Sequence, residues 1–497
     1  MVSAVEMFNK ELNVNMTDQT LDPEDWESVR SLGHTMMDDM IDYLRDVRTR
    51  KVWQPFPDPS KEFLTESLPQ EGLEVREVYD QFKTHIFPYT KGNIHPRFWA
   101  WVQGTGTPMG VLADMMASAM NPNATIGEQS PLYVDLQVIE WCKEMMNFPK
   151  NASGMLLSGA SMANTTALIV ARNVMLAHVR KDGLQSEQST ATIYTSTETH
   201  SCITKAGEVI GLGENNIKKI PVDDAYMVRT DLLEKEILQD KMDGKTPFCI
   251  VANAGTVNTG SIDDLKAIYE ISKKHNLWFH IDGAFGALAK MLPEYAEILR
   301  YIEKADSVAF DLHKWMYMPY EVGCVLIHDR QKHRNTFAIQ PAYLLNHERG
   351  LAAGPDSLNH YGIELSRGFK ALKVWMSLKE HGIQKYVGQI EKNILQARYL
   401  GLLAEHHPSL ELMAPIPLNV VCFRYNDGRL SDKQLDQVNK EIVMSLQEQG
   451  IASPSSTFLH GKYCIRVAIT NHRSIREDFD ILVESVINIG ASVVIKA

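Results

Sequence analysis

The sequence has no excess of positive charge. Its 497 residues include 50 lysine and arginine residues against 62 aspartate and glutamate residues, so the formal net charge is −12. Such a chain lacks the basic surface that attracts nucleic acid or an anionic membrane. We therefore expect neither of them as a partner.

Cysteine is scarce, and long apolar runs are missing. The six cysteines lie far apart, with no CxxC pair and no zinc-ligand spacing, so we expect reduced, mostly buried thiols and no metal site. No run of about 18 apolar residues occurs, and the start of the chain lacks the basic and apolar segments of a secretory signal. These absences favour a cytoplasmic enzyme that is not embedded in a membrane.

The composition is that of a large globular protein. Hydrophobic residues make up 44% of the chain and charged residues 23%, which excludes wholesale disorder and a disulfide-stabilised miniprotein. The length indicates one large domain with a smaller one, or two to three domains. No internal repeat or low-complexity tract is present.

Residues 1–95 differ in character from the rest of the chain. The apolar pattern from residue 25 to 44 predicts an amphipathic helix, and we expect the following prolines to break any regular element. These prolines are Pro55, Pro57, Pro59 and Pro69. One helix and a proline-rich arm cannot bury a core, so this segment is expected to pack on the main body or on a partner subunit.

Residues 96–385 have the pattern of an α/β domain. Short apolar runs alternate with helix-like stretches, which predicts a mostly parallel sheet covered on both faces. The expected strands are 191–195, 248–252, 277–281, 307–310 and 324–327, and the expected helices include 262–275 and 295–304. Residues 386–497 predict a smaller α+β domain, with strands at 418–425 and 463–470 and helices at 432–448 and 476–489.

The first candidate for chemistry is Lys314, in the sequence FDLHKW at residues 310–315. It follows a predicted strand, and ligands of open α/β sheets bind at the carboxyl ends of strands. An enclosed lysine shifts its pKa readily and is suited to Schiff-base chemistry. The alternative is a surface lysine whose stem packs on Trp315.

The second candidate is Asp282, which ends the apolar run of the sequence WFHIDGAFG at residues 278–286. A carboxylate there can hold the protonated pyridine nitrogen of pyridoxal phosphate and so make the ring an electron sink. The alternative is a turn or helix-capping aspartate. One strand–helix–strand step separates Asp282 from Lys314, so both can reach one pocket.

Two further signals are compatible with the same pocket. At residues 154–168 a turn of small residues leads into a helical stretch, whose first N–H groups can bind phosphate, with the Ser161 hydroxyl as an added donor. The fingerprints of nucleotide-binding loops are missing. His200 follows a predicted strand and can stack on a planar cofactor or transfer protons, unless it is a capping or core histidine.

Together these motifs resemble the pyridoxal phosphate-dependent group II amino-acid decarboxylases, closest in pattern to the aromatic-L-amino-acid decarboxylases. The resemblance covers roughly residues 25–485. Its most specific parts are HIDGAFG at 280–286 and DLHKW at 311–315, supported by HPRF at 95–98, SGAS at 158–161 and CIRVA at 464–468.

The resemblance implies an α/β enzyme of fold type I, with a seven-stranded sheet, that forms a homodimer in which residues 1–95 wrap around the partner. Lys314 would carry pyridoxal phosphate as the internal aldimine, Asp282 would pair with the pyridine nitrogen, and His200 would stack on the ring. Further contacts to the phosphate or to neighbouring ring groups would come from Ala160, Ser161, Thr256, Asp311 and His313. Lys314, His200 and Asp282 would be the catalytic residues.

For the substrate, the resemblance implies an aromatic L-amino acid: tyrosine, dopa, phenylalanine or tryptophan. Phe98, Trp101 and Ser366 would line the side-chain pocket, and the alternative for the aromatic residues is simple core packing. Arg466 is interpreted either as a contact to a substrate carboxylate or to the phosphate side, or as a structural salt bridge.

One departure from the family pattern bears on the product. The family has a loop tyrosine that protonates Cα, and the corresponding position here is Leu358 or Ser357. Tyr361, His360 and Tyr343 are nearby alternatives. An oxygen-dependent aldehyde synthase is therefore the main alternative to an amine-forming enzyme, followed by a decarboxylase of a non-aromatic amino acid. Transamination, desulfurisation and a non-enzymatic interaction protein are the more distant alternatives.

Overall fold

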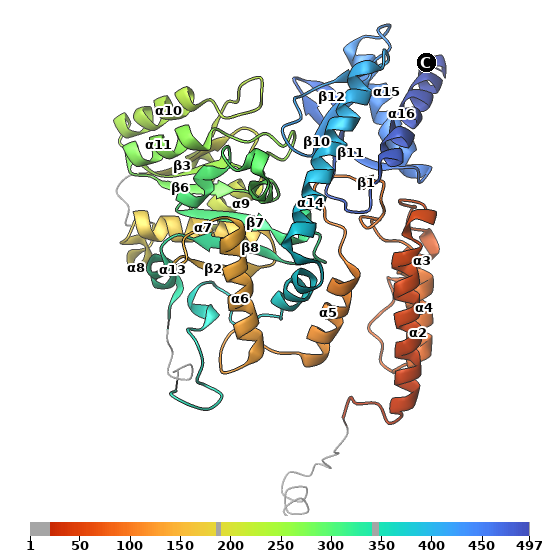
Figure 1. The fold of residues 1–497 in the computed structure, drawn as a ribbon, viewed down its shortest axis with the longest axis horizontal. Coiled ribbons are helices and arrows are strands. Elements are labelled where there is room, and N and C mark those ends of the chain that lie inside the picture. The colour runs from red at the N-terminus through yellow and green to blue at the C-terminus, as the bar shows by residue number, and fades with distance from the viewer. Residues whose placement is uncertain (1–19, 185–189, 340–346, 497) are drawn as a thin grey trace, which may run out of the picture. The chain divides into compact units, whose positions relative to one another are not determined.

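The structure is a computed structural model that describes residues 20–184, 190–339 and 347–496. Its internal contacts divide the chain into two units, shown as a ribbon in Figure 1. The smaller unit comprises residues 1–46 and 56–90, and the larger unit comprises residues 47–55 and 91–497. The larger unit contains both sheets of the structure and all of the predicted cofactor site.

A seven-stranded sheet is the centre of the larger unit, with the strand order β2-β8-β7-β6-β5-β3-β4. β8 runs antiparallel to both of its neighbours, and the other neighbouring strands run parallel. The strands are β2 (Ser153–Leu157), β3 (Ala191–Ser196), β4 (Ile217–Ile220), β5 (Thr246–Asn253), β6 (Trp278–Asp282), β7 (Ser307–Asp311) and β8 (Gly323–Ile327). The predicted mostly parallel, seven-stranded sheet is confirmed, although β2 and β4 were not among the expected strands.

The apolar runs of the strands are explained by burial on both faces of the sheet. Successive residues of a strand point to opposite faces, so Ile250 packs in one core cluster while Cys249 and Val251 pack in another. One face is covered by α6 (Ser130–Met145), α10 (Thr230–Met242), α11 (Leu265–His275) and the first part of α14 (Ala371–His406). The other face is covered by α7 (Ala160–Met175), α9 (Cys202–Val209) and α13 (Arg330–Phe337).

The helix expected at residues 295–304 is wrong. This part of the chain instead contains the 3₁₀ turns η5 (Pro293–Tyr295) and η6 (Arg300–Lys304). The buried side chains of Tyr295, Leu299 and Ile302 have a helix-like spacing. However, 3₁₀ turns also bring residues three apart onto one side, so this short spacing does not distinguish the two structures.

A second sheet, with five strands in the order β1-β11-β12-β10-β9, lies in the C-terminal part of the larger unit. The strands are β1 (Phe98–Trp99), β9 (Leu410–Leu412), β10 (Val420–Tyr425), β11 (Ser453–Leu459) and β12 (Lys462–Ala468), packed with α15 (Asp432–Glu448) and α16 (Arg476–Lys496). The expected strands and helices of this region are confirmed. The domain boundary placed at residue 385 stays a prediction: α14 crosses it, with non-helical backbone at Gly382.

The smaller unit contains α2 (Trp26–Arg45), α3 (Asp58–Phe63) and α4 (Val75–His85). The predicted first helix is confirmed, but the expectation that the prolines exclude regular structure is wrong. Pro59 lies in the first turn of α3, where its missing N–H group costs no helical hydrogen bond. α2 buries none of its residues, so this unit leaves apolar side chains exposed.

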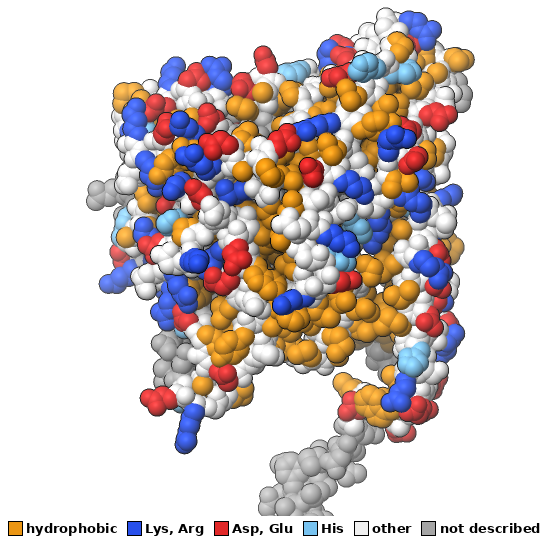
Figure 2. Space-filling model, in the orientation of Figure 1, with side chains coloured by type: hydrophobic (Ala, Val, Ile, Leu, Met, Phe, Trp, Pro, Cys, Tyr) orange, Lys and Arg blue, Asp and Glu red, His pale blue; other side chains and the backbone are white. Residues whose placement is uncertain are grey.

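An apolar surface patch lies over α5 (Pro108–Met120), as Figure 2 shows. Met115, Met116 and Met120 on this helix are all exposed. Grouped apolar side chains at a surface are typical of an interaction site. No helix within the described ranges has the length and apolar character needed to span a bilayer.

Candidate functional site

A cavity of about 510 Å³ lies at the carboxyl ends of the parallel strands. The predicted site residues that line it are Trp101, Ala160, Ser161, His200, Asp282, Asp311, His313 and Lys314. They come from separate parts of the chain, because the ends of β3, β6 and β7 and the start of α7 meet at this edge of the sheet. The fold thus brings together most of the residues that the sequence indicates.

Lys314 lies one turn beyond the end of β7, in the short helix α12 (Leu312–Trp315). Its Nζ atom is 3.0 Å from Oδ2 of Asp311, which is almost completely buried. Burial lowers the pKa of Lys314, but the charge of Asp311 and its hydrogen bond outweigh burial, so the pKa is raised overall. The free amine is therefore held as an ammonium ion that points into the cavity.

Asp282 is the last residue of β6 and is 5% exposed. Its Oδ1 atom accepts a hydrogen bond of 3.1 Å from the backbone N–H of Ala284. Burial raises the pKa of Asp282, and the nearby Lys314 charge and the hydrogen bonds lower it by less. A positive group placed beside this carboxylate would relieve the cost of burying it.

His200 lines the cavity from the turn between β3 and α9. Its Nδ1 atom accepts a hydrogen bond of 3.2 Å from the backbone N–H of Cys202 at the start of α9. The ring thus has the capping contact that was considered as an alternative, and it still faces the cavity. Burial lowers the pKa of His200, partly offset by Asp282, which favours the neutral imidazole.

The start of α7 forms the opposite end of the cavity. Ala160 and Ser161 open this helix of 16 residues, so its first N–H groups are available to an anion. A Cβ atom on the preceding Gly159 would lie 3.1 Å from Cε1 of His313, so only glycine fits without displacing that ring. His313 is itself held through its Nδ1 atom by the backbone of Val322.

Three predicted residues do not line the cavity. Thr256 is buried beside it, but its hydroxyl contacts Thr259 and accepts from the N–H of Ser261. Phe98 is buried in a small cluster with Val52 and Ala100, and Ser366 is exposed. The roles assigned to these three residues remain predictions that the geometry of the cavity does not support.

Arg466 and Tyr320 are among the cavity-lining residues that the sequence did not assign to the site. Arg466 is 4% exposed and donates hydrogen bonds to the carbonyl oxygens of Trp101, Val257 and Asn258. It has no carboxylate partner among the described residues, so the salt bridge considered from the sequence is not present there. Tyr320 stacks near the His313 ring, 4.3 Å between centroids, and no motif in the sequence pointed to it.

The alternatives to the loop tyrosine lie outside the cavity. Leu358 and Ser357 are buried, and the Ser357 hydroxyl donates to the carbonyl of Thr125. Tyr361 and His360 both bond to Asp356, at 2.7 and 2.8 Å. Tyr343 lies outside the described residues.

The cavity residues fit pyridoxal phosphate. Lys314 provides an amine for the aldehyde carbon, Asp282 a buried carboxylate for the pyridine nitrogen, and α7 a helix start for the phosphate. Oδ1 of Asp311 is buried without a hydrogen-bond partner, which marks a place where a further group is needed. Because a carboxylate only accepts hydrogen bonds, Asp311 suits the Lys314 amine better than it suits a phosphate.

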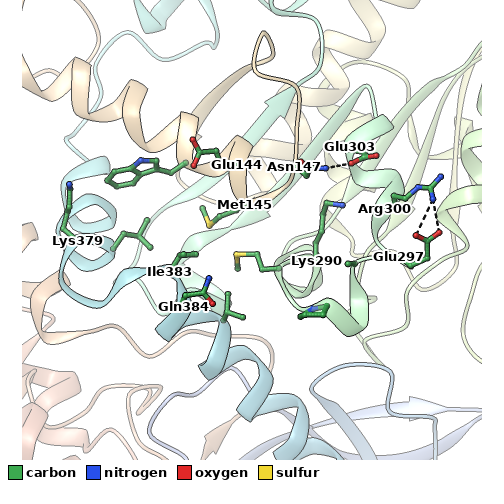
Figure 3. Close-up of a pocket in the computed structure, with 16 residues that line it drawn as sticks. Glu144, Met145, Asn147, Lys290, Glu297, Arg300, Glu303, Lys379, Ile383 and Gln384 are labelled. Carbon is green, nitrogen blue, oxygen red and sulfur yellow. Dashed lines mark hydrogen bonds and ion pairs between the residues drawn. The ribbon is translucent and has the colours of Figure 1, made fainter.

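A second cavity is larger, about 910 Å³, and contains none of the predicted residues. It lies between α6, the turns around η5 and η6, and α14, and its lining mixes apolar and charged side chains, as Figure 3 shows. Two polar pairs lie in its lining: Arg300 forms an ion pair with Glu297 at 3.2 Å, and the amide of Asn147 donates to Glu303. Size alone therefore does not identify the functional site.

Comparisons with known proteins agree with this assignment. The family model described as the pyridoxal-dependent decarboxylase conserved domain matches residues 57–426. An aromatic-L-amino-acid decarboxylase of Bacillus atrophaeus is 34% identical over 456 residues, 91% of this chain and 93% of the relative. A phenylacetaldehyde synthase of Arabidopsis thaliana is 27% identical over 485 residues, 95% of this chain and 98% of the relative.

Among solved structures, that of Oryza sativa TDC with PLP and tryptamine superposes with a TM-score of 0.88 at 23% identity. The superposition covers 95% of this chain and all of the other. At this identity the likeness supports the fold, and it agrees with the α/β architecture expected for fold type I.

Proposed function

The chain belongs to the pyridoxal-dependent decarboxylase family, and we propose that it converts an aromatic L-amino acid to the corresponding amine and CO2. The candidate substrates are tyrosine, dopa, phenylalanine and tryptophan. The observation that carries the proposal is the convergence of Lys314, Asp282 and the start of α7 on one cavity with Trp101 in its wall. The bacterial relative named for aromatic L-amino acids supports the substrate class.

Each end of the cavity has a distinct task in this proposal. The N–H groups of Ala160 and Ser161 would bind the phosphate, and Lys314 would hold the cofactor through Nζ. Asp282 holds a proton at the pyridine nitrogen. When bound, pyridoxal phosphate supplies an electron-withdrawing ring that accepts the electron pair left by the departing carboxylate.

The remaining residues of the cavity orient the substrate and move protons. The His200 imidazole would stack on the cofactor, and because its Nδ1 atom accepts from the Cys202 N–H, the neutral ring carries its proton on Nε2, where it is able to donate it. The free Lys314 amine, whose pKa Asp311 raises, carries its proton as an ammonium group and would be able to donate it to Cα. Tyr320 lies beside His313 and is a second source of this proton.

Trp101 is the strongest support for an aromatic side chain in the substrate. Its ring lines the cavity and is 55% exposed, with Lys91 Nζ 4.8 Å from the ring centroid, so part of its aromatic surface remains available for stacking. Arg466 holds the Trp101 carbonyl at 2.9 Å and so fixes the backbone that carries this ring. Phe98 backs Trp101 with ring centroids 6.3 Å apart, which is a supporting position and not a substrate contact.

An aldehyde product is the second candidate, and a specific observation favours it. Neither Leu358, Ser357, His360 nor Tyr361 offers a proton donor to the cavity, since all of them lie outside its lining. The relative from Arabidopsis thaliana is named a phenylacetaldehyde synthase. The chain would then consume oxygen and release ammonia and hydrogen peroxide.

We further propose a cytoplasmic homodimer in which residues 1–95 pack on the partner. The helix α2 buries none of its residues, and the methionines of α5 form an exposed patch, so both surfaces have apolar area to cover. The six cysteines are free and buried, which fits a reducing compartment. Sedimentation of the purified protein tests the dimer.

Product analysis tests the function. The purified protein is incubated with tyrosine, dopa, tryptophan and phenylalanine, while amine, CO2, oxygen and hydrogen peroxide are followed. Amine and CO2 in equal amounts without oxygen uptake would support the decarboxylase. Oxygen uptake with peroxide would instead support the aldehyde synthase, and no CO2 from any of the four would refute both.

A further inference from the structure

A line of buried polar side chains runs behind Asp282. Trp278, His280 and Asp282 alternate along β6 and point to the same face of the sheet. Ser307 on β7 is the register partner of His280, and Asn164 lies on α7, which covers this face. All of these side chains are at most 5% exposed, so none of their polar groups is satisfied by bulk water.

The line is joined by short hydrogen bonds. The Trp278 indole bonds to Oγ of Ser307 at 2.8 Å, and the same oxygen bonds to Nδ1 of His280 at 2.8 Å. Nε2 of His280 bonds to Oδ1 of Asn164 at 2.8 Å. The amide nitrogen of Asn164 contacts Sγ of Cys202 at 3.4 Å, this sulfur lies 4.0 Å from Oδ2 of Asp282, and the Asn164 side chain lowers the pKa of Asp282.

The direction of every bond in this line follows from its two ends. An indole N–H only donates and a carboxylate only accepts. Asn164 turns its NH2 group to the side of Cys202 and Asp282 and its oxygen to His280, which requires a proton on Nε2 of His280. Nδ1 of His280 then accepts from the Ser307 hydroxyl, which accepts from Trp278, so all donors point toward Asp282.

Burial keeps the His280 ring neutral. It lowers the pKa of His280 to about 3, so the ring is neutral and carries one proton. A neutral ring with Nε2 protonated accepts a hydrogen bond from Ser307 and donates one to Asn164. Aligned hydrogen bonds in a low-dielectric interior polarise and strengthen one another. Around Asp282 the other facing groups are Lys314 on α12, His200 after β3 and Cys202 on α9.

We infer that His280 and Asn164 are positioning residues that hold the Asp282 carboxylate ionised and oriented for a positively charged ring nitrogen, with Ser307 and Trp278 fixing the His280 tautomer. The inference rests on the proposed function, because the ring nitrogen belongs to pyridoxal phosphate. It adds to that function the residues that support Asp282 from behind, namely His280 and Asn164. Neither His280 nor Asn164 touches the reacting atoms.

The test compares His280→Leu with His280→Gln. Leucine removes the donor to Asn164, whereas the amide of glutamine is able to replace it. Pyridoxal phosphate labelled with ¹⁵N in the ring is bound to each purified protein, and the ring nitrogen shift is followed against pH. We expect His280→Leu to lose the ring proton about one pH unit earlier and to bind the cofactor about tenfold more weakly. His280→Gln should stay within threefold of the wild type.

The chain offers a matched control. His333 is also fully buried, its pKa is also lowered to about 3 by burial, and its Nδ1 atom also bonds to a serine, Ser153, at 2.8 Å. It does not line the cavity. His333→Leu should therefore leave the ring nitrogen titration unchanged.

The outcomes separate the inference from the function on which it rests. A wild type that binds no pyridoxal phosphate would refute the proposed function and the inference with it. A wild type that binds the cofactor, with the same ring titration in His280→Leu, would overturn the inference alone. Equal losses in His280→Leu and His280→Gln, or an equal loss in His333→Leu, would also overturn it, because they would indicate a general packing effect.

Discussion

The two cavities of the larger unit differ in where they place their charges. In the smaller cavity, Asp282 and Asp311 are buried and face an ammonium group on Lys314. In the larger cavity, Arg300 and Glu297 pair with each other at the rim, with side chains 52% and 81% exposed. Buried charge is costly unless a partner or a function compensates for it. We therefore propose the smaller cavity as the site, although the other has more volume.

The largest expected difference between the cavities concerns their lysines. Lys314→Ala removes the amine that would hold the cofactor, so turnover should fall below detection. Borohydride reduction followed by peptide mapping should label residue 314 in the wild type and no residue in the variant. Lys290→Ala, in the larger cavity, should retain the wild-type rate. A label on any lysine other than Lys314 would contradict the assignment.

The next effect concerns the buried carboxylate. Asp282→Asn keeps the shape of the side chain but removes the charge that holds the ring proton. We expect kcat/KM to fall by about 100-fold or more, as is typical when a preorganised electrostatic contact is removed. Glu303→Gln, a comparable change at the larger cavity, is the control. If Asp282→Asn stayed within threefold of the wild type, the ring-nitrogen role would have to be abandoned.

A smaller effect is expected on pH dependence. Asp311 raises the pKa of Lys314, so Asp311→Asn should lower it and leave more neutral amine at any given pH. The rate at which the apoprotein attaches pyridoxal phosphate should then rise at a lower pH than in the wild type. Stopped-flow absorbance across a pH series measures this rate. A shift of the attachment rate toward higher pH in Asp311→Asn would contradict the proposed effect of Asp311 on Lys314.

The smallest effect concerns the cavity wall. Trp101→Ala removes a stacking surface worth about 0.5–1.5 kcal/mol, so KM for an aromatic substrate should rise by about twofold to tenfold. Trp101→Phe keeps an aromatic face and should lose less. Steady-state kinetics with tyrosine and tryptophan measure both. An unchanged KM in Trp101→Ala would place the side-chain pocket elsewhere.

Much of this site was predictable because its parts obey local rules. Lys314 follows a buried strand and Asp282 ends one, and the ends of neighbouring parallel strands meet at one edge of a sheet. The small residues before Ala160 indicated a tight turn into a helix. The sheet was predictable for the same reason, since its strands are apolar on both faces.

Other parts depended on contacts that no local pattern reveals. Tyr320 reaches the cavity through a loop, and Arg466 bonds to carbonyl groups more than 200 residues away in the chain. The raised pKa of Lys314 depends on its pairing with Asp311, whereas burial alone would have lowered it. The alternation of Trp278, His280 and Asp282 was visible in the sequence. Only the structure shows that Asn164 of α7 lies next to His280, and no local pattern predicts that contact.

One consequence concerns the order in which the chain is made. The strand β1, at Phe98–Trp99, pairs with β11, and the Trp99 ring stacks on Phe479 with centroids 4.9 Å apart. The strand β1 leaves the ribosome early, but it cannot form its native contacts until almost the whole polypeptide has been synthesised. The C-terminal sheet cannot be completed during synthesis, and a truncated product would be left with an open edge that invites aggregation.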